Sequence, residues 1–254
     1  MQPGSKFEIL IPDDPAISAA AFNPATHPTF KRLFERPQLA DFAAEAKTYS
    51  DVCLLFTNES SQRITALTLA WSHPHPTLKG PSGGVSRSDS YYFGDNTAGV
   101  IPPQSQALIH PKRTIPAGVL EFENLLFAST DGRLNGLRDI DMIRDAPLVT
   151  AKFDTVIFED GRVLGADDSR TVEFITNRKR AANDFVALIR RANQEGVNLD
   201  EVLTRLRPSG TGGPREDPYG FWLATFARQL MRAPARDVGL IQYEHLPEPP
   251  QFFR

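Results

Sequence analysis

Apolar and polar positions change from a strand-like alternation to a helical period at Gly165. Before that point, short apolar runs bounded by polar turns are typical of strands. Predicted strands cover residues 7–11, 52–57, 64–71, 90–93, 107–109, 119–128 and 153–159. They do not alternate regularly with helices, which disfavours a doubly wound α/β fold.

Two of the predicted strand pairs are hairpins. Residues 52–57 and 64–71 flank a polar turn, and we expect them to pair with each other. Asp160-Gly161 lies between two further apolar runs. This dipeptide predicts a type I′ turn, in which both central residues have positive φ. Residues 73–88 are rich in Pro, Gly and Ser, which predicts an exposed loop.

A long helix is expected after Gly165, with Asp167, Asp168 or Ser169 as its cap and Gly196 at its end. Its apolar stripe comprises Val172, Ile175, Ala182, Phe185, Val186, Ile189 and Ala192. Asn198 predicts the start of a short second helix, and Asp217-Pro218 predicts the start of a third. Residues 238–243 are expected either to add a last strand or to dock on the rest of the chain.

These elements predict a mainly β chain with C-terminal helices. Residues 1–47 form a Pro/Ala-rich leading segment, with a helix over residues 29–47 that Pro37 interrupts. Residues 48–165 are predicted to form an Ig-like antiparallel β-sandwich. Residues 166–254 are predicted to form a helical appendage that docks on the sandwich, because three short helices alone make a thin core. A separate helical domain is the alternative.

Composition places the chain among ordinary globular proteins. It has 254 residues, 41% hydrophobic and 23% charged, with a net charge of −3. That balance excludes a generally polycationic nucleic-acid binder. No apolar run approaches the roughly 20 residues of a membrane span, and the first apolar run, interrupted by Glu8, is too short for a signal peptide. We therefore expect a soluble chain, extracytoplasmic only if a leader has been removed. Cys53 is the single cysteine, so no intrachain disulfide is possible.

Two stretches carry a resemblance. Residues 57–67 contain an N-x-S-x-x-x-I-T-A pattern, and residues 154–167 contain a V-x-F-E-D-G hairpin that leads into the long helix. Together they resemble a group of uncharacterised bacterial β-sandwich proteins, over about a quarter of the chain. No activity is attached to that group, so the resemblance implies no functional residue. Many of its members look secreted.

Candidate metal ligands occur in two places. His73 and His75 are two residues apart in the predicted loop and can face one side, with His110 as a third ligand. Asp139, Asp141 and Asp145 can bind a hard divalent cation through their carboxylates. The competing interpretations are an exposed Pro-rich loop for the histidines and a polar connector for the aspartates.

Two further clusters of charged residues are functional candidates. Glu159, Asp160, Asp167 and Asp168 gather around one hairpin, where paired carboxylates can do acid–base work. Turn and cap roles account for the same residues. The helical region is rich in arginine, which can hold an acidic partner or a phosphate backbone, but a solvated helix face is the competing interpretation.

The leading hypothesis is a non-catalytic binding or structural module that recognises a protein partner. It rests on the predicted β-sheet middle and on the lack of a strong catalytic motif. The alternative is a hydrolase with a metal or carboxylate site in the sandwich loops. A weaker third hypothesis is an adaptor that binds an acidic partner or nucleic acid through the arginine-rich helix. We assign no catalytic residue and expect no cofactor, and the sequence leaves the oligomeric state open.

Overall fold

The computed structural model describes residues 6–24, 44, 47–74, 80–91, 101–111, 113–116, 146–206, 216–233 and 236–254. These residues form two β-sheets and four α-helices, with about equal helix and strand content. The chain is therefore mixed α and β, and the prediction of a mainly β chain is wrong, because helices occupy almost all regular structure after Arg170. No helix in the described ranges is both long and apolar enough to cross a bilayer.

The chain divides into two compact units. Unit 1 comprises Met1–Ser90, Thr97–Ser169 and Phe253–Arg254, and unit 2 comprises Tyr91–Asn96 and Arg170–Phe252. The last two residues thus belong to the β-sheet unit although they follow the helices in the sequence.

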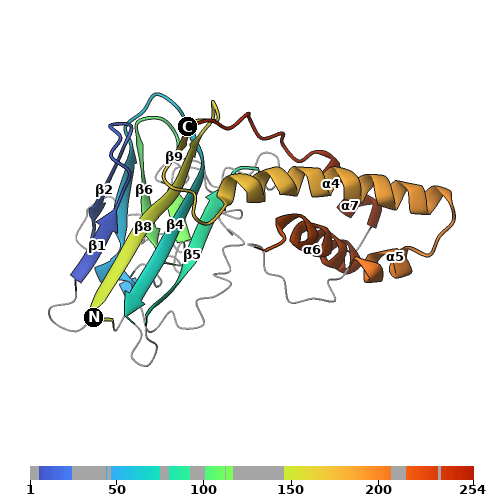
Figure 1. Cartoon of the computed structure of the whole chain (residues 1–254), viewed down its shortest axis with the longest axis horizontal. Coiled ribbons are helices and arrows are strands. Elements are labelled where there is room, and N and C mark those ends of the chain that lie inside the picture. Colours follow the sequence, from blue (N-terminus) through green and yellow to red (C-terminus); the bar gives the residue numbers. More distant parts are fainter. Residues whose placement is uncertain are drawn as a thin grey trace. The chain divides into compact units, whose positions relative to one another are not determined.

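Sheet A of unit 1 has the strand order β1-β8-β4-β5 (Figure 1). Its strands are β1 (Lys6–Leu10), β4 (Ile64–Pro74), β5 (Pro81–Asp89) and β8 (Leu148–Phe158), and the short β9 (Val163–Leu164) also pairs with β8. β1 runs parallel to β8, with Phe7 opposite Val149, whereas the other pairs are antiparallel. The antiparallel sandwich is predicted for residues 48–165; β1 lies before that range and adds a parallel strand to sheet A. Parallel neighbours need a long connection, and here most of unit 1 lies between them.

Sheet B has the order β2-β3-β6-β7 and is antiparallel throughout. Its strands are β2 (Ile17–Ala21), β3 (Leu54–Asn58), β6 (Ser105–His110) and β7 (Arg113–Pro116). A 3-10 turn, η2 (Ser50–Val52), precedes β3. The predicted strands at 7–11, 52–57 and 107–109 are confirmed to within about two residues, the usual scatter of strand ends.

One hydrophobic core joins the two sheets. Phe56 of β3 stacks on Phe153 of β8 with ring centroids 5.1 Å apart, and Phe7 of β1 stacks on Trp71 of β4 at 6.3 Å. Buried apolar residues from strands of both sheets contribute to this core. Two sheets around a shared core are thus present, while this strand order does not confirm the Ig-like topology.

The predicted hairpin of residues 52–57 with 64–71 is wrong. β3 pairs with β2 and β6 in sheet B, whereas β4 pairs with β5 and β8 in sheet A. The polar link 58–62 therefore carries the chain from one sheet to the other. Both runs are apolar on the core side in either arrangement, so the pattern alone does not distinguish a hairpin from a crossover.

Asn58 holds that crossover together. Its buried side-chain Nδ2 lies 2.8 Å from the Gln62 carbonyl, 3.2 Å from that of Ile101 and 2.9 Å from that of Pro102, and these three acceptors share its two N–H groups. Its Oδ1 accepts from the Ser60 backbone N–H at 3.1 Å and from the Ser60 hydroxyl at 2.7 Å. One amide thus joins the link to residues 101–102, which precede β6, and its own polar atoms are satisfied, as a buried polar side chain requires.

The predicted loop over residues 73–88 is wrong at both ends. His73 and Pro74 end β4, and residues 81–89 form β5, which pairs along β4. Small residues suit this pairing: a Cβ at Gly83 would overlap the backbone carbonyl of Trp71. The Trp71 indole N–H also donates to the Ser86 hydroxyl at 2.9 Å. These contacts stabilise β5 although its Gly and Ser residues have low strand propensity.

The second predicted hairpin, of β8 with β9, is confirmed. Its turn is not type I′, because Gly161 has a φ of 95° while Asp160 lies outside the positive-φ region. The Gly161 N–H donates to the Phe158 carbonyl at 3.0 Å, and the Asp160 carboxylate accepts from the Arg162 N–H at 2.9 Å. This is a turn followed by a glycine in the left-handed region, a common three-residue connection.

Unit 2 contains α4 (Thr171–Gln194), α5 (Leu199–Arg205), α6 (Pro218–Arg232) and α7 (Arg236–Glu244). The predicted caps of α5 and α6 are confirmed: Asn198 accepts from the Asp200 N–H and Asp217 from the Gly220 N–H. Gly196, with a φ of 65°, follows α4 as predicted.

The predicted cap of α4 is wrong. Arg170 precedes the helix in the left-handed conformation and makes no side-chain cap hydrogen bond. A last strand at 238–243 is also wrong, since these residues lie in α7. The predicted stripe of α4 is buried apart from Val172, and Phe185 contacts Phe226 and Tyr243 in the core of unit 2.

Several predictions lie outside the described residues. They are most of the helix at 29–47, the strand at 119–128, part of the strand at 90–93 and most of the linker before Glu216. Ser90 and Tyr91, which are described, follow β5 outside any strand.

Candidate functional site

The densest polar network in unit 1 is centred on Asp154, a carboxylate inside the apolar strand β8. Thr68 pairs with Thr155 and Leu69 with Phe153, so Asp154 has no partner on β4 and forms a β-bulge. A bulge inserts an unpaired residue and redirects its side chain. Asp154 is only 1% exposed, so each of its oxygens needs hydrogen bonds.

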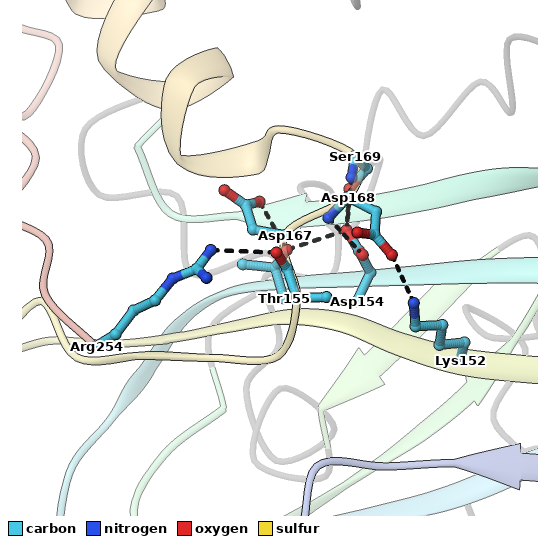
Figure 2. A network of polar contacts seen from close by, with 8 residues as sticks. Lys152, Asp154, Thr155, Asp167, Asp168, Ser169 and Arg254 are labelled. Atoms are coloured by element: carbon cyan, nitrogen blue, oxygen red, sulfur yellow. Dashed lines mark hydrogen bonds and ion pairs between the residues drawn. The ribbon is translucent and has the colours of Figure 1, made fainter.

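Four donors surround that carboxylate (Figure 2). Oδ1 accepts from the Asp168 backbone N–H at 2.9 Å. Oδ2 accepts from the Ser169 backbone N–H at 3.0 Å, from the Ser169 hydroxyl and from the Thr155 hydroxyl at 3.2 Å. Burial acts to raise the pKa of Asp154, but the hydrogen bonds from Ser169, Asp168 and Thr155 together outweigh it and hold that pKa below its ordinary value. Asp154 is therefore a carboxylate anion.

The loop after β9 is shaped to reach this anion. Gly165 has a φ of 94°, and Asp167 and Arg170 each have a φ of 56°. A Cβ at Gly165 would overlap the Asp154 carbonyl, so glycine is required there for space as well as for conformation. The Asp167 N–H donates to that carbonyl at 2.9 Å. Left-handed residues cost about 1–3 kcal/mol each outside glycine, and the Asp154 hydrogen bonds offset this cost.

Charged side chains surround the network on its exposed side. The Lys152 ammonium lies 2.6 Å from the Asp168 carboxylate, and the hydrogen bond between them raises the pKa of Lys152. The Thr155 hydroxyl lies 2.9 Å from the Asp167 carboxylate as well as 3.2 Å from Asp154, so these two carboxylates share its single proton. The Arg254 guanidinium donates to the Ala166 carbonyl at 3.1 Å, so a residue from the end of the chain reaches this loop (Figure 2).

The chemistry open to Asp154 follows from this geometry. Four hydrogen bonds occupy its two oxygens, and they lower its basicity. A general base or a nucleophile needs a lone pair directed at substrate. The Asp154 carboxylate instead fixes the backbone of residues 167–169, immediately before the chain enters α4. The role of Asp154 is therefore to hold a strained loop in place.

A second feature lies next to this loop, on the outer edge of β9. The Val163 N–H donates to the Phe253 carbonyl at 2.8 Å, and the Phe253 N–H donates to the Gly161 carbonyl at 3.0 Å. Arg162 and Phe253 form a parallel β-bridge. The edge of the hairpin therefore holds an extended segment of the chain by main-chain hydrogen bonds.

The candidate histidine ligands lie on different sheets. His73 is in β4 of sheet A and His110 is in β6 of sheet B. His75, Asp139, Asp141 and Asp145 lie outside the described residues. Within the described ranges, no group of three or more His, Cys, Asp or Glu side chains has the arrangement of a metal site.

His73 has one unusual property. It is 2% exposed, and its Nδ1 lies 3.0 Å from the Pro74 carbonyl. Its Nε2 is buried without a hydrogen-bond partner. His110 is also buried, and it stacks on Tyr49 with ring centroids 5.7 Å apart. A buried nitrogen of this kind costs free energy unless something else satisfies it.

The acidic residues of the hairpin have structural partners. Glu159 accepts from the Arg63 N–H at 3.2 Å, and Asp160 accepts from the Arg162 N–H within the turn. Asp167 and Asp168 belong to the Asp154 network described above. Each of the four carboxylates therefore has a local role in the hairpin or the loop.

The arginine-rich helix of unit 2 is largely paired within its own unit. Arg190 lies 2.7 Å from Glu244, and Arg191 lies 2.8 Å from Glu195. Arg178 is buried against the Trp222 ring. These pairings reduce the positive charge that the helix presents to a phosphate backbone. A shallow surface depression on α5 is lined by Asp200, Glu201, Thr204 and Arg205.

Sequence reasoning did not single out Asp154. The available signal was a single carboxylate among apolar residues in the run Phe153-Asp154-Thr155-Val156, at a position where a strand should be buried on both faces. The role of Phe253 had no comparable signal, since its contacts depend on how the chain returns to unit 1.

No family model matches this chain, and searches of curated proteins and of solved structures also find no match.

Proposed function

We propose that this protein is a non-catalytic binding or structural module that recognises a protein partner. The observation that supports the proposal is the occupied edge of β9, where Phe253 is held by main-chain hydrogen bonds to Gly161 and Val163. Addition of an extended segment to a sheet edge is a recurrent mode of peptide recognition, in which the main chain supplies affinity.

The Asp154 network supports the same function. It fixes residues 167–169, three residues after the end of β9, through the hydrogen bonds from Asp168 and Ser169. A binding edge that is already ordered loses little conformational entropy when a partner binds. The buried carboxylate thus contributes to recognition by holding the loop beside the edge.

The experiment is capture of the partner followed by reconstitution. The intact chain is immobilised, bound proteins from its source cells are identified by cross-linking and mass spectrometry, and each candidate is purified. We expect at least one purified protein to bind the intact chain with a measurable Kd. We also expect that the intact chain does not convert this protein into any product. If no purified candidate binds in calorimetric titration, the proposal is wrong.

The alternative function is a hydrolase with a metal or carboxylate site in the loops of the sandwich. One observation favours it: the buried His73 Nε2 lacks a hydrogen-bond partner, and an imidazole nitrogen of this kind can bind a metal. The test is the metal content of the purified protein, with thermal melts with and without EDTA. A stoichiometric metal whose removal lowers Tm supports the hydrolase. Absence of metal, with an unchanged Tm, rejects its metal-dependent form.

We also propose that unit 1 is an Ig-like sandwich and that the chain is related to the bacterial β-sandwich proteins that it resembles. The support is the pair of sheets around one core and the patterns at residues 57–67 and 154–167. An adaptor that binds nucleic acid is disfavoured by the ion pairs of Arg190 and Arg191.

A further inference from the structure

The segment on the β9 edge is held mostly through its backbone. Both main-chain groups of Phe253 are used, one toward Gly161 and one toward Val163. The Phe253 side chain is 50% exposed, so burial of its ring contributes only part of the binding. A third polar contact is that of the Arg254 guanidinium with the Ala166 carbonyl at 3.1 Å.

The receiving edge belongs entirely to unit 1 and is built from residues 161–166. Gly161 and Ala166 present carbonyls and Val163 presents an N–H, so acceptor, donor and acceptor follow one another along it. Arg162 is held in place by its position over the Phe158 ring, 4.2 Å from the centroid, and by Asp14 at 3.4 Å. The edge therefore fits an extended residue that is followed by a long hydrogen-bond donor.

The segment before Phe253 is suited to arrive extended. Pro247, Pro249 and Pro250 lie in it, and proline favours the extended polyproline conformation. Residues 246–252 form no helix or strand. The contact has low intrinsic affinity, because it consists of three hydrogen bonds and a half-exposed ring. It persists because a short tether attaches the segment covalently to the same chain.

We propose that residues 161–166 form a binding site for an extended Phe-Arg segment of a partner protein, which the chain's own Phe253-Arg254 occupies and blocks. The proposal rests on the proposed function, because it names the kind of partner segment that the module recognises. A partner gains access by displacing the internal segment. The hydrogen bonds to Gly161, Val163 and Ala166 are then made by the partner instead.

The size of the blocking effect follows from the tether. A short tether gives an effective concentration on the order of 1 mM. Against an intrinsic Kd on the order of 0.1 mM, it weakens the apparent affinity for a free peptide about tenfold. Release of the internal segment should restore that factor.

The test uses the full chain carrying Phe253→Pro and Arg254→Ala. Proline removes the N–H that donates to Gly161, and alanine removes the guanidinium on Ala166. The matched control is Gln251→Ala, at an exposed position outside these contacts. The probe is a fluorescent peptide with the sequence of residues 247–254, and a second peptide carries the same two substitutions.

We call the chain with Phe253→Pro and Arg254→Ala the released variant. We expect it to bind the native peptide about tenfold more tightly than the wild type or the Gln251→Ala control does. The substituted peptide should not bind. Amide hydrogen exchange gives a second readout: the Val163 amide is protected in the wild type, exposed in the released variant and protected again when peptide is added.

Equal peptide affinity in the wild type and a folded released variant would overturn the inference, as would a Val163 amide that peptide does not protect. If the double variant does not fold, Arg254→Ala alone keeps both main-chain hydrogen bonds and should give a smaller gain in affinity; no gain contradicts the proposal. A purified partner that binds while every peptide arm fails would leave the proposed function standing and remove this inference alone.

Discussion

The guanidinium carbon of Arg178 lies 4.5 Å from the centre of the Trp222 ring, and Arg178 is 2% exposed. A second ring, that of Phe174, lies 5.6 Å from the same carbon. A desolvated cation over an aromatic face is worth about 2 kcal/mol, and the buried stem of the arginine adds packing. Arg178 belongs to the arginine-rich stretch that the sequence suggests is a solvated helix face. In the structure it is instead part of the core of unit 2.

We therefore predict that Arg178→Ala lowers the free energy of unfolding by about 2–4 kcal/mol. The measurement is urea denaturation followed by far-UV circular dichroism. The matched control is Arg180→Ala, because Arg180 lies 4.9 Å over the Tyr219 ring but is exposed, and its loss should cost less than about 1 kcal/mol. Equal losses in the two variants would contradict the role of burial.

A second prediction concerns Asp154→Asn, which keeps the shape of the side chain and removes its charge. One of the two acceptor atoms becomes an N–H donor that faces the donors of Asp168 or Ser169. We expect a loss of about 2–4 kcal/mol, as for a broken buried hydrogen-bond network to a charged group. Asp168→Asn is the control: its side chain is 68% exposed, so loss of its ion pair with Lys152 should cost at most about 1 kcal/mol.

The same carboxylate predicts a pH dependence. The pKa of Asp154 is lowered from its ordinary value of 3.8, despite the opposing effect of burial, by hydrogen bonds from Ser169, Asp168 and Thr155. A lowered pKa in the folded state contributes stability that is fully present above the unfolded-state pKa and is lost as pH falls through the folded-state pKa. The stability difference between wild type and Asp154→Asn should be constant from about pH 5 to 7 and shrink below about pH 4. Urea titrations across this range measure it, and a difference that grows on acidification would reverse the sign.

Local sequence signals predicted local structure well and long-range pairing poorly. Asp217 with Pro218, and Asn198, marked helix starts that depend only on neighbouring residues. The apolar runs around Asn58 did not reveal that β3 and β4 belong to different sheets, because both alternatives bury the same side chains. Figure 1 shows β1 beside β8, a neighbour that no local pattern identifies.

Asn58 supplies the next prediction. Alanine at this position would remove the amide donor that the carbonyls of Ile101, Pro102 and Gln62 share. We expect Asn58→Ala to cost about 2–4 kcal/mol, and Asn58→Asp to cost more at neutral pH because a carboxylate would face those carbonyls. Thermal melts compare the two variants. A greater Tm for Asn58→Asp than for Asn58→Ala at pH 7 would argue against this network.

Gly83 gives a steric prediction. A Cβ there would overlap the Trp71 carbonyl, so Gly83→Ala should force β5 away from β4 and lower the free energy of unfolding by about 1–3 kcal/mol. Gly80 has no atom within 4 Å of the same added group, which makes Gly80→Ala the control. We expect its effect to stay within about 0.5 kcal/mol. Chemical denaturation of both variants side by side decides the point.

Cys53 should be unreactive in the folded protein. Burial, and then the neighbouring Asp51 carboxylate, raises its pKa to about 12. Only the thiolate attacks a disulfide reagent, so labelling by an aromatic disulfide at pH 8 should wait for unfolding. Labelling rates with and without urea measure this. Rapid labelling of the native protein would show that the chain opens locally at Cys53, immediately before β3.

The site was less accessible to sequence reasoning than the fold. Asp167 and Asp168 were considered as acid–base candidates or as helix caps, whereas the structure uses their backbone N–H groups around Asp154. The decisive feature is the unpaired position of Asp154 between Phe153 and Thr155 in the pairing with β4. A bulge depends on the register of two strands, and register is not encoded in either strand alone.

The parallel pairing of β1 with β8 has a consequence for synthesis. Lys6 and its partner Leu148 are far apart in the chain, so a ribosome working at about 5–20 residues per second makes β8 on the order of 10 s after β1. Throughout that interval β1 lacks β8, its pairing partner in sheet A. The nascent chain must therefore carry an unpaired apolar strand, Phe7 and Ile9 included, and contact with a chaperone during this period would favour correct assembly over pairing with another nascent chain.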